Sequence, residues 1–158
     1  MAEGRVLLER DEETGIARLT LDNPARRNSY DQAMRNQLGA HLDELADDDA
    51  IKVVHLRGSE GVFSAGADMA GAYSWYGDSA KPDRRRPSQR RRLAVDRKTF
   101  TLYHNFLGYP KATVAEVRGY ALGGGFELAL MSDISVVAGD TSVGMPATRF
   151  LGPALGSL

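Results

Sequence analysis

The 158-residue chain contains no cysteine, one tryptophan and no hydrophobic run close to the ~20 residues that span a bilayer. The absence of cysteine excludes disulfides, thiolate nucleophiles and cysteine-ligated zinc sites. Neither charge is in large excess, since 20 basic and 21 acidic side chains leave a formal net charge of −1. This balance gives no overall attraction to nucleic acid or to a membrane surface. The sequence does not show the pattern of a signal peptide, which is a basic start followed by an apolar segment. We therefore expect a cytoplasmic protein.

Predicted strands and helices alternate along the chain, which is typical of an α/β fold. The expected strands cover residues 5–10, 16–22, 51–58, 111–119 and 134–140. The expected helices cover 29–46, 90–110 and about 124–132, with Ser29 as the first N-cap. Since strands joined through helices pair in parallel, we predict a largely parallel sheet. The first two strands are joined by a short acidic turn that ends in Gly15.

Two glycine-rich loops each follow a predicted strand and precede helical sequence: FSAGADM (63–69) and ALGGGFE (121–127). Small residues allow a ligand to approach the backbone closely, and a helix N-terminus leaves N–H groups unpaired. One N–H from each loop is enough to bind a single carbonyl oxygen, as in an oxyanion hole. Neither loop matches the glycine patterns that bind nucleotide phosphates. Glycines that only allow close packing of a helix on a strand remain the alternative.

One carboxylate, Glu127, follows the second loop directly and is flanked by apolar residues at positions 126 and 128–131. A buried carboxylate is destabilising unless it has a partner or a task. Proton transfer is such a task, so Glu127 is the candidate general acid or base. The alternative is a helix residue that faces solvent.

The two loops together resemble the signature of the enoyl-CoA hydratase/isomerase (crotonase) family. LTLDNPARRNS (19–29) is similar to the family's N-terminal strand and loop, and VVHLRG (53–58) ahead of the first loop also supports the resemblance. The resemblance implies the crotonase-like α/β fold of repeated ββα units, with a parallel sheet flanked by helices. It makes residues 1–158 the N-terminal (spiral) domain, and the C-terminal trimerisation helices are expected to be absent from this chain. The tail supports this, because Pro153 suits a first helical turn just before the sequence stops.

The resemblance implies enolate chemistry on acyl-CoA thioesters, within fatty acid metabolism. The N–H groups of Ala65 and Gly124 would form the oxyanion hole, and Glu127 would act as acid and base. Contacts to the substrate or its coenzyme A are implied for Ala25, Arg26, Arg27, Ala65, Gly66, Ala67, Asp68, Met69, Gly123, Gly124, Pro146 and Ala147. For the two arginines, a solvated loop is the alternative.

The resemblance implies no cofactor beyond the coenzyme A moiety of the substrate. His41, His55 and His104 lack the spacing of metal ligands. A homotrimer or a dimer of trimers is the expected assembly, and neither a membrane nor a nucleic acid is an expected partner.

The sequence departs from the family pattern at one position. Aligned on the Gly-x-Pro turn of VGMPATRF (143–150), Ala147 stands where hydratases of the family carry a second glutamate. Alanine cannot exchange a proton, so efficient two-glutamate hydration is in doubt. A single carboxylate suffices for a double-bond isomerase, or for hydration or retro-aldol chemistry with a supporting hydroxyl. The candidates for a supporting group are Asp68, Tyr73, Tyr76 and Thr148.

The segment KPDRRRPSQRRR (81–92) carries seven basic residues and one aspartate. Three interpretations stay open: a solvated loop that continues into the next helix, contact with coenzyme A phosphates, and RNA binding. RNA binding requires stacking aromatics, which this segment lacks. The alternative to an enzyme is a non-catalytic family member that binds acyl-CoA or RNA.

Overall fold

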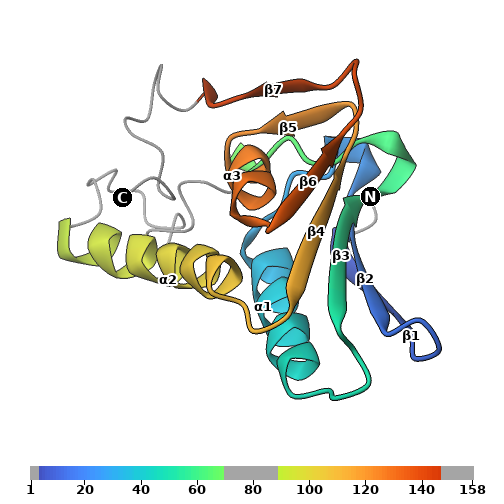
Figure 1. The fold of residues 1–158 in the computed structure, drawn as a ribbon. Coiled ribbons are helices and arrows are strands. Elements are labelled where there is room, and N and C mark those ends of the chain that lie inside the picture. The colour runs from blue at the N-terminus through green and yellow to red at the C-terminus, as the bar shows by residue number, and fades with distance from the viewer. Residues whose placement is uncertain (1–3, 70–88, 147–158) are drawn as a thin grey trace.

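The computed structural model describes residues 4–69 and 89–146 (Figure 1). Its strands are β1 (Arg5–Asp11), β2 (Ile16–Asp22), β3 (Val53–Gly58), β4 (Ala112–Val117), β5 (Tyr120–Leu122), β6 (Ile134–Val137) and β7 (Ser142–Gly144). Its α-helices are α1 (Gln32–Ala46), α2 (Gln89–Leu107) and α3 (Gly124–Met131), with 3-10 helices η1 (Pro24–Arg26) and η2 (Ser59–Gly61). None of these described helices offers the long apolar stretch that a membrane crossing requires.

The main sheet has the strand order β1-β2-β3-β4-β6. Strands β1 and β2 form an antiparallel hairpin, and β2, β3, β4 and β6 pair in parallel. These pairings confirm the predicted parallel crossovers, and Gly15 in the hairpin turn has a φ of +70°. Strands β5 and β7 form a separate parallel pair, which was not predicted. Both are three residues long, too short to show a periodic pattern.

The core lies between the sheet and the helices that cover one of its faces. The predicted apolar face of α1 is confirmed, because Met34, Leu38, Leu42 and Leu45 are all buried. They pack with alternate residues of β2, β3 and β4, as the two-residue period of a strand requires. Helix α2 packs against both α1 and α3, and α3 lies beside β4 and β5 (Figure 1).

The N-cap of α1 is Asp31, so the predicted Ser29 cap is wrong. The Asp31 carboxylate accepts a hydrogen bond from the Met34 N–H at 2.9 Å. Serine and aspartate cap helices about equally well, so residue type did not decide between them. The loop before the helix decides, because Arg27 and Asn28 both take φ values of +53° and turn the chain before Ser29.

A pair of polar side chains joins the end of α3 to β4. Thr113 donates from its backbone N–H and from its hydroxyl to the Asp133 carboxylate, each at 2.8 Å. The Asp133 N–H donates in return to the Thr113 hydroxyl at 2.9 Å. These hydrogen bonds, above all the one from the Thr113 backbone, hold the pKa of Asp133 below its ordinary value. The pair therefore lies directly before the parallel pairing of β4 with β6, in which Val114 is opposite Ile134.

A carboxyl group with a lowered pKa stabilises the folded state above about pH 4, and that contribution is lost as the pH falls through the folded-state pKa. We therefore expect Asp133→Asn to lower the urea midpoint at pH 7, and the difference from wild type to shrink at pH 3. Urea unfolding followed by circular dichroism at pH 7, 5 and 3 measures this. Asp140→Asn, in an exposed turn, is the control for the loss of one charge. A difference that stays constant over this pH range would contradict the prediction.

Candidate active site

The two glycine-rich loops lie against each other. The Ser64 N–H donates to the Tyr120 carbonyl at 2.9 Å, and the Leu122 N–H donates to the Ser64 carbonyl at 3.0 Å. Gly66 lies so close to the second loop that a Cβ there would overlap the Leu122 carbonyl oxygen and lie 3.0 Å from the Gly124 nitrogen. Its φ of +88° also favours glycine. The structure thus brings together two segments that are far apart in the sequence.

Two fully buried polar residues fasten the first loop to the N-terminal loop. The Ser64 hydroxyl donates to the Asn28 carbonyl at 2.7 Å and accepts from the Gly66 N–H at 3.0 Å. The Asn28 side chain donates to the carbonyls of Ser59 and Val62 at 2.9 and 2.6 Å. Sequence analysis did not identify these residues as important, because nothing in a single sequence marks an asparagine or serine as buried.

The prediction that the Ala65 N–H is a donor of the oxyanion hole is wrong. Its N–H already donates to the Arg27 carbonyl at 2.9 Å, inside the protein. A different N–H of this loop, that of Ala67, faces outward, for the following reason. The Gly66 carbonyl accepts from the Tyr30 N–H at 2.9 Å. Because the C=O and N–H of a trans peptide point in opposite directions, the Ala67 N–H points away from Tyr30.

The second predicted donor, the Gly124 N–H, lies at the first position of α3. The Gly123 carbonyl accepts from the Glu127 N–H at 3.0 Å, as in the first turn of a helix. The Gly124 N–H therefore points out of the helix N-terminus, where donors have no partner within the helix. Gly123 is the N-cap, with a φ of +53°, and its own N–H donates to the Gly144 carbonyl at 2.9 Å.

Glu127 is buried, with only 7% of its surface exposed. It lies one helical turn after Gly124 and therefore on the same face of α3. The hydroxyls of Tyr30 and Tyr103, 2.6 Å apart, lie beside this face. A Cβ on Gly124 would lie 2.5 Å from the Tyr103 hydroxyl oxygen and would overlap that of Tyr30. The interpretation of Glu127 as a solvent-facing residue is therefore wrong.

The tyrosine hydroxyls lie in an environment that disfavours their ionisation. Burial is the main cause that raises the pKa of both Tyr30 and Tyr103. The Glu127 carboxylate adds to the increase for Tyr103 through its charge and a hydrogen bond. Sequence analysis missed both tyrosines, since nothing in a single sequence distinguishes them from ordinary core tyrosines. Of the supporting groups that were predicted, Tyr73, Tyr76 and Thr148 lie outside the described residues.

The two predicted coenzyme A arginines have partners within the protein. Arg26 forms an ion pair with Asp68 at 3.0 Å, which links the N-terminal loop to the first glycine-rich loop. The Arg27 guanidinium lies 5.1 Å from the centroid of the Tyr120 ring. The remaining predicted contacts Ala25, Met69 and Pro146 are exposed, whereas Ala147 lies outside the described residues. Residues 81–88 of the basic segment also lie outside them, and 89–92 begin α2.

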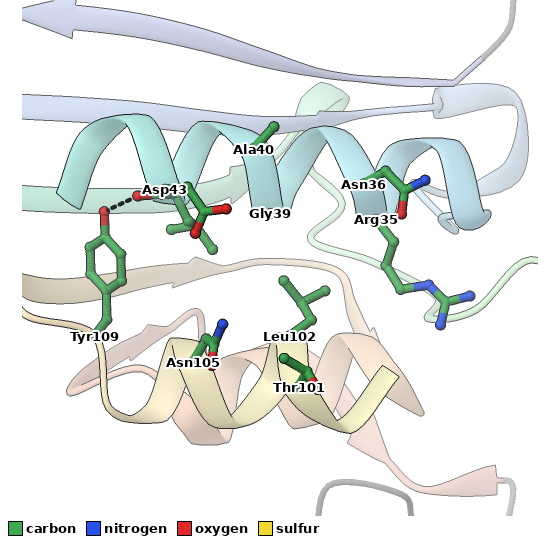
Figure 2. Close-up of a pocket in the computed structure, with 10 residues that line it drawn as sticks. Arg35, Asn36, Gly39, Ala40, Asp43, Thr101, Leu102, Asn105 and Tyr109 are labelled. Atoms are coloured by element: carbon green, nitrogen blue, oxygen red, sulfur yellow. Dashed lines mark hydrogen bonds between the residues drawn. The ribbon is translucent and has the colours of Figure 1, made fainter. Parts of the chain in front are cut away.

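A separate hollow of about 350 Å³ lies between α1 and α2 (Figure 2). Arg35, Asn36, Asp43 and Asn105 are among its lining residues, and the Tyr109 hydroxyl at one end donates to the Leu42 carbonyl. No residue of the glycine-rich loops lines it, so it is distinct from the candidate site. Within residues 4–69 and 89–146, no cluster of three or more histidine or acidic side chains is arranged to hold a metal ion.

The packing of α3 against Ser64 gives a direct test of the loop arrangement. A Cβ on Gly125 would lie 2.6 Å from the Ser64 carbonyl oxygen, which is backbone and has little freedom to move. We expect Gly125→Ala to lower the free energy of unfolding by about 1–3 kcal/mol. Gly139→Ala is the matched control, because no heavy atom lies within 4 Å of its Cβ position. Equal urea midpoints for the two variants would contradict the described packing.

Comparisons with known proteins identify the family of the chain. The enoyl-CoA hydratase/isomerase family model matches residues 11–153. The 2,3-dehydroadipyl-CoA hydratase of Escherichia coli is 33% identical over 128 residues, which cover 81% of this chain and 45% of that protein. Enoyl-CoA hydratase domain-containing protein 2 of Bos taurus is 32% identical over 144 residues, 90% of this chain and 45% of that protein. The chain thus spans about half the length of the curated relatives it matches.

Solved structures show the same similarity. AtuE of Pseudomonas aeruginosa has a TM-score of 0.76 and 35% identity, covering 91% of this chain and 52% of that one. An enoyl-CoA hydratase/isomerase of Xanthobacter autotrophicus has a TM-score of 0.77 and 30% identity, and the match covers 96% of this chain and 57% of that one. The fold is therefore crotonase-like, and the chain belongs to the enoyl-CoA hydratase/isomerase family.

Proposed function

We propose that this chain binds an enoyl-CoA thioester and transfers a proton at the carbon next to the thioester carbonyl, with Glu127 as the acid and base. One observation carries the proposal. Glu127 is a buried carboxylate on the same face of α3 as Gly124, whose N–H points out of the helix N-terminus. A proton acceptor and a donor for a carbonyl oxygen thus lie one helical turn apart.

The proposed reaction begins when Glu127 takes an α-proton of a 3-enoyl-CoA thioester. The electron pair of the broken C–H bond forms the enolate, and negative charge develops on the thioester oxygen. The Gly124 N–H and the positive end of the helix dipole stabilise that charge. Return of the proton from Glu127 to the γ-carbon moves the double bond and completes an isomerisation.

Ala67, in place of Ala65, is the proposed second donor of the oxyanion hole. Its N–H points away from Tyr30, and Gly66, the residue before it, lies beside Gly124. Each such donor typically contributes ~3–4 kcal/mol of transition-state stabilisation. The exposed residues around the first loop, Arg26 and Met69 among them, are the proposed contacts of the coenzyme A moiety.

The relatives' names indicate enoyl-CoA thioesters as the substrate class and include hydration among the reactions. Ala147 favours chemistry that needs one carboxylate, as in an isomerase, over hydration with two. The same alanine supports the second candidate, a family member that binds acyl-CoA without turnover. A homotrimeric assembly and a cytoplasmic location stay predictions.

We expect Glu127→Gln to reduce kcat on 2-enoyl-CoA or 3-enoyl-CoA thioesters by about 10²–10⁴-fold, because the isosteric amide cannot exchange protons. Isothermal titration calorimetry with the same thioesters should show that binding is retained. Glu12→Gln, in the exposed β1–β2 turn, is the control. Binding by wild type without any turnover would overturn the enzyme proposal in favour of the binding protein.

The oxyanion hole itself is tested with a ligand that lacks the carbonyl. Crotonyl-CoA and the corresponding crotyl-CoA thioether share the coenzyme A moiety and the carbon chain. Two hydrogen bonds of about 1 kcal/mol each predict roughly 30-fold tighter binding of the thioester. Calorimetric titration of Glu127→Gln with both ligands measures the ratio without turnover. Equal affinities would show that no N–H donor meets the carbonyl oxygen.

A further inference from the structure

Three buried polar side chains from three elements meet next to Gly124. Tyr30 precedes α1, Tyr103 lies on α2, and Glu127 lies on α3, with exposures of 3%, 3% and 7%. The phenol oxygens are 2.6 Å apart, and both lie against the Cα of Gly124. Polar groups this deeply buried are destabilising unless hydrogen-bonded to each other.

The chemistry of the three groups sets the direction of their hydrogen bonds. An ionised carboxylate only accepts, whereas a phenol hydroxyl donates once and also accepts. Tyr103 therefore donates to Glu127, and its oxygen accepts the proton of Tyr30. The pKa of Tyr103 agrees with this order. Burial raises it most, the hydrogen bond from Tyr30 lowers it, and the Glu127 carboxylate raises it.

A fourth group, Arg35 of α1, acts on the tyrosines from a position next to the α1–α2 hollow. Its positive charge lowers the pKa of both phenols, against the larger effect of burial. Its guanidinium donates to the Thr99 hydroxyl on α2. A half-buried cation on α1 and a buried carboxylate on α3 thus act on the phenols in opposite directions.

We propose that Tyr103, supported by Tyr30, is a positioning residue that holds the Glu127 carboxylate in the orientation required for proton transfer. This inference rests on the proposed function of Glu127. Because the phenols lie against Gly124, the same hydroxyl pair fixes the carboxylate relative to the Gly124 N–H. Tyr103 binds the Glu127 carboxylate, and that carboxylate is the group proposed to meet the substrate. The pair is the supporting hydroxyl that one-carboxylate chemistry requires, supplied from outside the glycine-rich loops.

The test compares Tyr103→Phe and Tyr30→Phe with Tyr109→Phe in the whole chain. Tyr109, two residues after α2, donates its hydroxyl to the Leu42 carbonyl at 2.6 Å, so its variant removes a comparable hydrogen bond away from Glu127. For Tyr103→Phe we expect kcat on the wild-type enoyl-CoA substrate to fall about 10- to 100-fold, the loss typical of one hydrogen bond to a charged group, with KM little changed. Tyr30→Phe should show a smaller fall in kcat, and Tyr109→Phe none.

A double-mutant cycle separates positioning from stability. Adding Tyr103→Phe to Glu127→Gln should reduce the residual kcat no further, because the group being positioned is already gone. An active wild type whose Tyr103→Phe variant keeps its kcat within about twofold would overturn this inference alone. An equal fall in kcat for Tyr109→Phe would do the same. A wild type with no turnover on any enoyl-CoA would overturn the proposed function and this inference together. Should Tyr103→Phe fail to fold, Tyr30→Phe carries the test through the same hydrogen bonds.

Discussion

Ser64 joins the segments that form the site, and the other features of the site depend on it. Its backbone N–H and carbonyl bind the two ends of β5, and its hydroxyl bonds both Asn28 and Gly66. The residue is fully buried, so each of these groups has to find its partner inside the protein. Removing one partner would leave a buried polar group unsatisfied, at a cost of about 1–3 kcal/mol. The hydrogen bonds of Ser64 therefore tie both glycine-rich loops and the N-terminal loop together.

The glycines follow from this close packing. Gly66 lies against the Gly124 nitrogen, Gly124 against two phenols, and Gly125 against Ser64. Each contact uses the space that a Cβ would occupy. The glycines of the second loop allow the N-terminus of α3 to lie close against the first loop.

Glu127 is a residue whose presence in the core is not explained by its contribution to the stability of the fold. A carboxylate in an apolar helix is unfavourable, and a leucine at this position would satisfy the core better. The structure instead places Tyr103 and Tyr30 beside it. Departures from the simplest packing rule concentrate at functional sites. The buried position of Glu127 is the reason why it, and no exposed carboxylate, is the residue proposed for proton transfer.

The sequence by itself determined the parallel α/β order, the apolar face of α1 and the two loops with Glu127, because these depend on periodicity and on short contiguous motifs. It failed where two neighbouring residues offer the same chemistry. Asp31 rather than Ser29 caps α1, and the Ala65 N–H is bound internally. Only the tertiary structure decided which amides face outward, and it alone brought the two tyrosines to Glu127. Hydrogen-bond partners that are distant along the chain leave no local pattern, so these features arise from packing between elements.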